Sequence, residues 1–289
     1  MFADLHLHTH FSDGTYSPEE LAAHARRCEL AAVALTDHDT VEGCPRMDAA
    51  CASLGIEFIA ATELTAELGH FELHILGYGL DIENARLRNE LARYQVIRQN
   101  RIREMCARLN RAGIPLAAET VFGLANCKAP GRPHIARALV QAGYCANLDE
   151  AFQRYLKMHR IAWVPKAKVH ARDAIALIQH AGGVAVMAHP GLNRSDDFIP
   201  ELVASGLDGI ECFHSRHSTA TSEKYLTIAD RHGLLVTGGS DCHGMNKGRP
   251  LIGTLKIPYE HVRRLNERLA SSRRARGTAP ALPAAAALS

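Results

Sequence analysis

Apolar and polar positions alternate at the start of the chain, in "ADLHLH" at residues 3–8. If this segment is a strand, its side chains point alternately to opposite faces. Leu5 and Leu7 then anchor a core, while His6, His8 and, by the same spacing, His10 share the other face. The alternation alone also describes an ordinary half-buried strand with a wet outer face, so the rest of the chain has to decide whether the imidazoles bind a metal.

Further apolar runs of the buried-strand type recur along the chain, and most of them end in polar residues. Early in the chain they are "AAVAL" before "TDHD", "EFIAA" before "TELTAE", and "FELHILGY", which contains His74. Late in the chain they are "GGVAVMAHP", "GLDGIECFH" and "GLLVTGGSDCHG". Each late run follows a helical stretch, so the chain alternates strands with helices.

Helix signals separate these runs. "SPEELAAHARRCEL" starts with Ser17 as an N-cap and has Glu20 three residues later, which is a capping-box pattern. Helices are also expected over 170–181 and 218–232, and each of them is followed by a glycine in the usual C-terminal position. The chain is therefore expected to fold in βα units.

Strands that alternate with helices predict a largely parallel sheet, and about seven such strands predict a closed or nearly closed α/β barrel. Residues 1–90 and 166–275 are expected to form this barrel. The strand rhythm breaks between them, so 91–165 is expected to be a helical insertion over the barrel mouth. The low-complexity end, 276–289, is expected to be a mobile tail.

Composition places the chain among ordinary globular proteins. Of its 289 residues 47% are hydrophobic and 22% are charged, and 33 Lys plus Arg against 31 Asp plus Glu give a formal net charge of +2. This balance neither requires nor excludes nucleic acid as a partner. The chain has neither a membrane-length apolar run nor a signal-peptide pattern, so we expect a cytoplasmic protein with no membrane partner. Most of the eight cysteines are expected to be reduced core residues.

Histidines and carboxylates collect where the predicted strands end. In an α/β barrel the carboxyl ends of the strands form the face on which active sites are built, and imidazole and carboxylate groups bind borderline and harder divalent cations. Singly, His74 could be a core histidine, Glu63 a helix cap, and Asp37 or Asp39 a turn residue. Together, nine candidates exceed what one metal uses: His6, His8, Asp13, His38, Glu63, His74, His189, Asp241 and His243.

Four of these segments carry a family resemblance. "DLHLHTHFSDG", "ALTDHDT", the "HP" after an apolar strand and the late "GSDCHG" are similar to the signature motifs of the PHP (polymerase and histidinol phosphatase) family, which is related to the amidohydrolases. The resemblance spans residues 1 to about 253. The insertion, with "GRPHIARALVQAGY", "AFQRYL" and "VPK", resembles the stand-alone nucleotide-phosphoesterase branch of that family.

The resemblance implies a distorted (β/α)7 barrel with two or three divalent metals, most often manganese, with iron or zinc as alternatives. It assigns one metal to His6, His8, Glu63 and Asp241. Glu63 would bridge to a second metal, which His74 and His189 also bind. The third metal is assigned to Asp13, His38 and His243. Cys242, between two of these ligands, is expected to pack in the core instead.

Independently of the family, two or more neighbouring metals suit phosphoester hydrolysis, because they acidify a bound water and stabilise charge on the phosphoryl oxygens. We therefore expect a metal-bound hydroxide, held by Glu63, His74, His189, Asp13 and His38, to be the nucleophile. The acid for the leaving group would be a metal-bound water or His217. No serine-hydrolase, P-loop or dinucleotide motif is found in the sequence.

For substrate binding, "GRPH" offers Arg132 and His134 at a helix start, where backbone N–H groups favour anions. Lys166 would add a second positive charge. The main hypothesis is hydrolysis of the 3'-phosphate of a nucleoside 3',5'-bisphosphate, with the insertion binding the 5'-phosphate. The alternatives are a 5' to 3' exoribonuclease on short 5'-phosphorylated RNA, a histidinol-phosphate phosphatase, and a non-catalytic PHP scaffold. No obligate protein partner is inferred.

Overall fold

The computed structural model describes residues 1–69, 71–165, 169–193 and 196–277, and eight strands form one sheet within these ranges. The strands are β1 (Phe2–Leu7), β2 (Leu30–Leu35), β3 (Glu57–Leu68), β4 (Phe71–Tyr78), β5 (Val184–Met187), β6 (Gly209–His214), β7 (Leu235–Gly239) and β8 (Ile257–Pro258).

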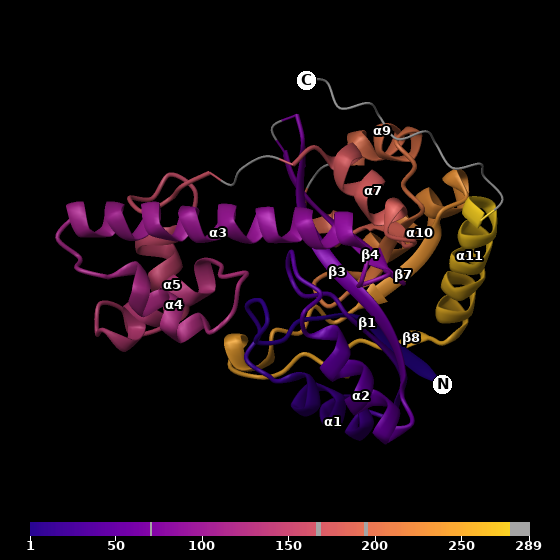
Figure 1. Ribbon diagram of the computed structural model, residues 1–289, viewed down its shortest axis with the longest axis horizontal. Helices are drawn as coiled ribbons and strands as arrows, with labels where there is room; N and C mark the ends of the chain where they lie inside the picture. The colour runs from indigo at the N-terminus through magenta and orange to yellow at the C-terminus, as the bar shows by residue number, and fades with distance from the viewer. Residues whose placement is uncertain (70, 166–168, 194–195, 278–289) are drawn as a thin grey trace.

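Helices surround this sheet and fill the insertion (Figure 1). They are α1 (Pro18–Arg27), α2 (Cys44–Leu54), α3 (Ala85–Arg111), α4 (Ala118–Ala125), α5 (Arg132–Gln141), α6 (Leu148–Ala151), α7 (Ala171–His180), α8 (Pro190–Asn193), α9 (Ile199–Ala204), α10 (Thr219–His232) and α11 (Glu260–Gly277), together with the short turns η1 (Phe152–Leu156), η2 (Asp196–Phe198) and η3 (Gly244–Lys247). In the described ranges, none of these helices has the length and apolar character needed to cross a membrane.

The sheet runs in the order β7-β6-β5-β4-β3-β2-β1-β8. The pairs β1–β2, β2–β3, β5–β6 and β6–β7 are parallel, as the sequence predicts. β4 is antiparallel to both of its neighbours, because the chain turns back directly after β3 at Gly69 (φ 61°) instead of crossing over through a helix. The prediction of an α/β barrel with a helical insertion is confirmed, and the antiparallel β4 is one of its distortions.

The barrel closes between β1 and the segment after β7. The backbone N–H of His8 donates to the carbonyl of Cys242 at 3.0 Å, and Leu7 forms an isolated bridge with Cys242. This contact brings the first strand of the chain next to the "GSDCHG" segment. Cys242 is fully buried among apolar residues, as expected.

Local sequence signals account for the helix ends. Ser17 and Glu20 form the capping box at the start of α1. α10 begins after Ser218, whose side chain accepts from the backbone of Thr221, and it ends at Gly233 with φ 63°, a left-handed conformation that glycine adopts without strain.

α3 connects the barrel with the insertion. Leu87, Leu91 and Tyr94, in its first half, pack into the core of the barrel. The second half contributes to a separate apolar core in the insertion, which contains Ile102, Met105, Leu109, Ile135 and Leu139. In Figure 1, α4 and α5 lie together against the part of α3 that extends away from the strands.

The helical insertion starts earlier than expected, since α3 begins at Ala85 and not near residue 91. Its separate apolar core supports the proposed division into barrel and insertion. At the other end, α11 continues to Gly277 and so includes the first two residues of the expected tail. The remaining residues of that tail, 278–289, lie outside the described residues.

Candidate metal centre

The barrel brings all nine candidate side chains to one rim. Within the described part of the chain, their ligand atoms form four overlapping groups, in each of which the atoms lie within 4.8 Å of one another. The groups are His6, His8 and Asp241; His6, Glu63 and His189; His38, Glu63 and His74; and His8, Asp13, His38 and His243. Residues that are 235 positions apart in the sequence, such as His8 and His243, therefore share one site.

One set of donor atoms has the spacing of ligands around a single cation. His6 Nε2 lies 3.1 Å from His8 Nε2 and 3.3 Å from Glu63 Oε2, and His8 Nε2 is also 3.3 Å from that oxygen. Asp241 Oδ1 lies 3.5 Å from His6 Nε2 and 3.3 Å from His8 Nε2. A tetrahedral site with bonds of about 2.0–2.1 Å has ligand–ligand distances of about 3.3–3.4 Å, so these four residues fit one metal.

The carboxylate of Glu63 stands between this set and a second one. Its Oε2 faces His6 and His8, while its Oε1 lies 2.6 Å from His74 Nδ1 and 2.9 Å from His189 Nε2. His74 lies inside β4 and not at a strand end, and because β4 is antiparallel, its first half reaches the same rim. The geometry is that of a bridging carboxylate.

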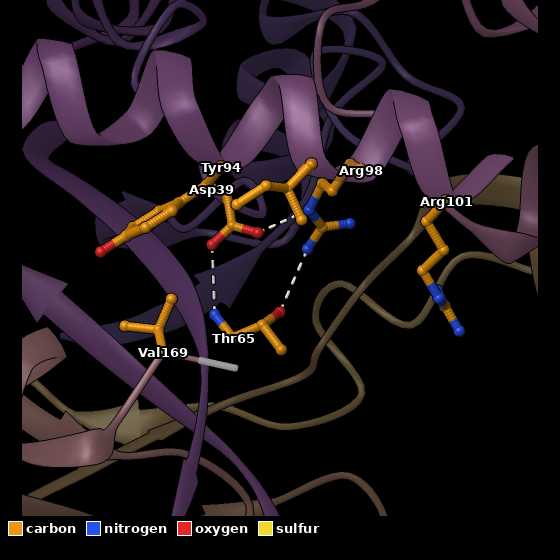
Figure 2. A pocket seen from close by; sticks show the side chains of 7 residues that line it. Asp39, Thr65, Tyr94, Arg98, Arg101 and Val169 are labelled. Atoms are coloured by element: carbon orange, nitrogen blue, oxygen red, sulfur yellow. Dashed lines mark hydrogen bonds and ion pairs between the residues drawn. The ribbon is translucent and has the colours of Figure 1, made fainter. Parts of the chain in front are cut away.

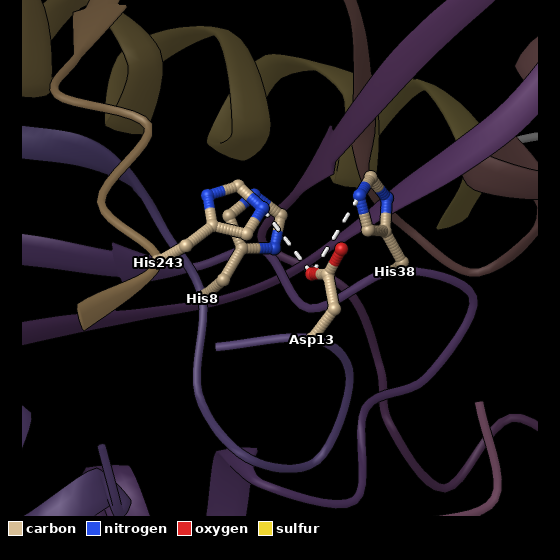
Figure 3. A group of neighbouring side chains, drawn as sticks. All are labelled: His8, Asp13, His38 and His243. Carbon is tan, nitrogen blue, oxygen red and sulfur yellow. Dashed lines mark ion pairs between the residues drawn. The ribbon is translucent and has the colours of Figure 1, made fainter. Parts of the chain in front are cut away.

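The third set surrounds Asp13, in the loop after β1 (Figure 3). Asp13 Oδ1 lies 3.2 Å from His243 Nε2 and 3.9 Å from His38 Nε2. The ring of His8 stacks on that of His243 with 4.1 Å between centroids. The side chain of Arg137, on α5, donates to the backbone carbonyl of Asp13 at 2.9 Å and so ties this loop to the insertion.

Charge at the site is balanced between imidazoles and carboxylates. Burial raises the pKa of Glu63, but neighbouring His38, His74 and His6 lower it further, so the pKa lies well below its ordinary value. Burial opposes protonation of His243 as well, yet the nearby carboxylates, Asp13 foremost, raise its pKa to about 9. Without a cation, protons on the histidines supply the positive charge that the buried carboxylates need, and a divalent cation could replace them.

The donor chemistry fits divalent metals. The groups offer only imidazole nitrogens and carboxylate oxygens, which suit zinc, iron or manganese. Asp13 Oδ1 and His38 Nδ1 are buried and have no hydrogen-bond partner in the described part of the chain. Buried polar atoms are normally satisfied, so these atoms are available as ligands. His10 is in none of the described groups; its ring stacks on Phe11 instead.

Residues near the site that the sequence left open have structural roles. The carboxylate of Asp37 accepts hydrogen bonds from the backbone N–H and hydroxyl of Thr9 and from the hydroxyl of Ser12, which fixes the loop before Asp13. Asp39 adopts a left-handed φ of 50°. Figure 2 shows its carboxylate between Arg98, at 2.5 Å, and the backbone N–H of Thr65, at 3.1 Å.

Arg98 and Arg101 on α3 line a pocket with Asp39 and Thr65, beside the candidate metal ligands His38 and Glu63 (Figure 2). Sequence analysis missed both arginines. Burial, followed by the positive charges of Arg132 and Arg98, lowers the pKa of Arg101 to about 10. The three guanidinium groups thus lie close enough to repel one another, a pattern that favours binding of an anion.

The predicted substrate contacts Arg132 and His134 lie at the start of α5. Gly131, just before them, is close to the metal ligands, because a Cβ atom built on it would be 3.8 Å from Asp13 Oδ2. The guanidinium of Arg132 lies over the ring of Phe152, 5.8 Å from its centroid. His134 is buried, and burial lowers its pKa to about 4; its Nδ1 accepts from Gly131, so the neutral ring carries its proton on Nε2.

The other two predicted substrate contacts are His217 and Lys166. His217 is tied to the backbone at both ring nitrogens, since Nδ1 donates to Cys212 and Nε2 accepts from Gly191. Its role as a leaving-group acid stays a prediction and would require these bonds to break. Lys166 lies outside the described residues.

Glu211 and His214, on β6, also reach the site and were missed. Glu211 contacts His6 and His189, and His214 Nε2 lies 3.5 Å from Asp241 Oδ2. An acidic residue inside the apolar run "GIECF" was the available signal for Glu211, because a buried charge requires partners.

Three comparisons bear on the chemistry of this site. The family model of the PHP domain matches residues 4–159. A 5'-3' exoribonuclease named Rnm from Salmonella typhimurium is 35% identical over 83% of this chain and 84% of its own length. A 3',5'-nucleoside bisphosphate phosphatase from Chromobacterium violaceum is 34% identical over 86% of this chain and 90% of its own length. A solved structure of a candidate metal-dependent phosphoesterase from Bifidobacterium adolescentis is 35% identical, with a TM-score of 0.85, over 92% of this chain and 96% of that one.

Proposed function

The chain belongs to the PHP domain family, and we propose that this metal-dependent phosphoesterase removes the 3'-phosphate from nucleoside 3',5'-bisphosphates such as adenosine 3',5'-bisphosphate. The products would be the nucleoside 5'-monophosphate and phosphate. The relative from C. violaceum carries this activity in its name. The nine candidate ligands are all present here, which supports a catalytic centre over a scaffold.

The observation that carries the proposal is the two-sided carboxylate of Glu63. One oxygen faces His6 and His8 while the other faces His74 and His189. An arrangement in which one carboxylate contacts two sets of imidazoles is suited to more than one cation. We propose two or three metals, with manganese as the first choice because the family resemblance favours it.

When bound, divalent cations would neutralise charge that develops on the phosphoryl oxygens and acidify a water molecule to act as the nucleophile. The chain's own part is to hold the donors in place. Glu63 fixes the spacing between the two sets of histidines, and the Asp37 hydrogen bonds fix the loop that carries Asp13. The burial of these groups strengthens their electrostatic interactions with a substrate phosphate.

The second phosphate of the substrate would bind at the insertion. α5 begins beside Asp13, and Arg132 on α5 shares its surroundings with Arg101 on α3. A phosphate would relieve the repulsion between these guanidinium groups and could accept bidentate hydrogen bonds from them. Backbone N–H groups at the start of α5 would add to its binding.

A 5' to 3' exoribonuclease is the second candidate, because the relative from S. typhimurium is as similar to this chain as the phosphatase is. Both reactions hydrolyse the ester on the 3' side of a 5'-phosphorylated nucleotide, and they differ in the group attached to the far side of the scissile phosphate. Phosphate release should be measured with nucleoside 3',5'-bisphosphates, nucleoside monophosphates, 5'-phosphorylated oligoribonucleotides and histidinol phosphate. Turnover of bisphosphates well above that of the oligoribonucleotides supports the first candidate, and the reverse order supports the second.

Arg132→Ala should remove most of the advantage of a bisphosphate over a nucleoside 3'-monophosphate. Binding of the 5'-phosphate is expected to position the 3'-phosphate over the metals. Loss of a charge-assisted contact worth about 1.5–3 kcal/mol corresponds to a roughly ten- to hundredfold lower kcat/KM. The kcat/KM values of both substrates should be measured for the wild type and the variant.

Arg103→Ala is the matched control, because Arg103 also lies in the insertion and over a phenylalanine ring, that of Phe122. It should keep the preference for bisphosphates. If Arg132→Ala keeps the full preference, the 5'-phosphate binds elsewhere. If the wild type shows no preference, the bisphosphate hypothesis is wrong.

A further inference from the structure

We propose that Glu211 is a positioning residue of the metal centre, which fixes the ring of His6 and the backbone of His189 so that both can bind metal. The inference rests on the metal centre proposed above and goes beyond its ligand set. Glu211 lies on β6 and is fully buried, and it is in none of the ligand groups within the described residues. A carboxylate at such a position is costly unless both of its oxygens have partners.

Both oxygens of Glu211 contact candidate ligands. Oε1 lies 2.9 Å from His6 Nδ1, and Oε2 accepts from the backbone N–H of His189 at 2.7 Å. One carboxylate on β6 thus connects β1 with the segment after β5. Because both oxygens are occupied in this way, Glu211 is arranged to support ligands and not to bind a metal itself.

The contact with His6 determines which ring nitrogen faces the metal centre. An ionised carboxylate can only accept, so Nδ1 of His6 must carry a proton. In the neutral ring, Nε2 then has a free lone pair, and it points at His8 Nε2 and Glu63 Oε2, at 3.1 and 3.3 Å. A carboxylate behind a metal-binding histidine orients the ring and makes it a stronger ligand.

The contact with His189 stabilises a strained backbone. His189 has a φ of 29°, in the left-handed region that residues with a side chain rarely adopt. Its N–H donates to Glu211, and in this conformation its Nε2 lies 2.9 Å from Glu63 Oε1. Glu211 therefore supports one histidine on each side of the Glu63 carboxylate.

Glu211→Gln tests this inference with little change in shape. The amide oxygen can still accept from the N–H of His189, but the amide NH2 then faces His6 Nδ1 and can only donate. His6 would have to carry its proton on Nε2, the atom that should bind metal. We expect the affinity for Mn²⁺ to fall about ten- to hundredfold, measured on metal-stripped full-length protein by competition with a fluorescent chelator.

Thr237→Val is the matched control. Thr237 is equally buried and pairs with Glu211 on the neighbouring strand β7, so it reports the effect of a mild change in the same layer of the barrel. Its affinity for Mn²⁺ should stay close to that of the wild type. An equal loss in both variants would show that any disturbance of these strands weakens the site and would overturn the specific role of Glu211.

The wild type provides a readout that a purely structural role of Glu211 would not set. In ¹⁵N NMR spectra of the Zn²⁺-loaded protein, His6 should be protonated at Nδ1 and bound to zinc through Nε2; the opposite arrangement overturns the inference whether or not the variant folds. Unchanged Mn²⁺ affinity in Glu211→Gln contradicts the role of Glu211 alone. Failure of the wild type to bind metal contradicts the metal centre, and this inference with it.

Discussion

Replacing Glu63 with glutamine should lower turnover roughly a thousandfold or more, which corresponds to about 4 kcal/mol of lost transition-state stabilisation. The neutral amide keeps the size of the side chain but has one oxygen instead of two. It can serve His6 and His8 or His74 and His189, but not both sets. Metal content should fall together with activity. Both are measured on the same preparation, with its circular dichroism spectrum as a test of folding.

Glu57→Gln is the control for this experiment, because Glu57 lies at the opposite end of the same strand and binds Asn266 and Tyr259 away from the metal centre. This variant should keep its metal and its turnover, even if it loses some stability. Near-normal turnover of a metal-loaded Glu63→Gln protein would refute the bridging role.

Removing the metals should abolish phosphate release and lower the melting temperature. A cation present at about 100 times its Kd stabilises the folded state by about 2.7 kcal/mol, which for a chain of this size corresponds to a shift on the order of 5–10 °C. The physical reason is that Glu63, Asp13 and Asp241 are carboxylates at the centre of the site and lose their counter-charge.

Chelator-treated protein should be compared with the same sample after Mn²⁺ is restored. Activity and melting temperature should both recover, because the described fold holds the ligand groups in place through its own hydrogen bonds. Full phosphate release in excess chelator would show that the reaction does not use these metals.

The sequence predicted the parts of the fold that depend on local pattern. The capping box of Ser17 and Glu20 and the helix end at Gly233 are read from a few neighbouring residues. The rim of histidines was also predictable, because parallel strands place their carboxyl ends together. The direction of β4 was not, since the pattern "FELHILGY" is the same for either direction and tertiary pairing decides it.

The supporting residues of the site were beyond the sequence because their partners are distant in the chain. Glu211 contacts His6 across 205 positions, and Arg98 contacts Asp39 across 59. Neither contact follows a helix or strand period, so no local spacing indicates it. Such contacts become visible only after the barrel has closed and α3 has packed on it.

The most direct test of the central claim is the number of metal ions bound per chain. Full-length protein should be purified gently, loaded with Mn²⁺, freed of excess metal and measured by elemental analysis against protein concentration. The two sets of histidines on either side of Glu63, with the third set around Asp13, predict more than one equivalent per chain. One equivalent or less would contradict the proposed multinuclear centre.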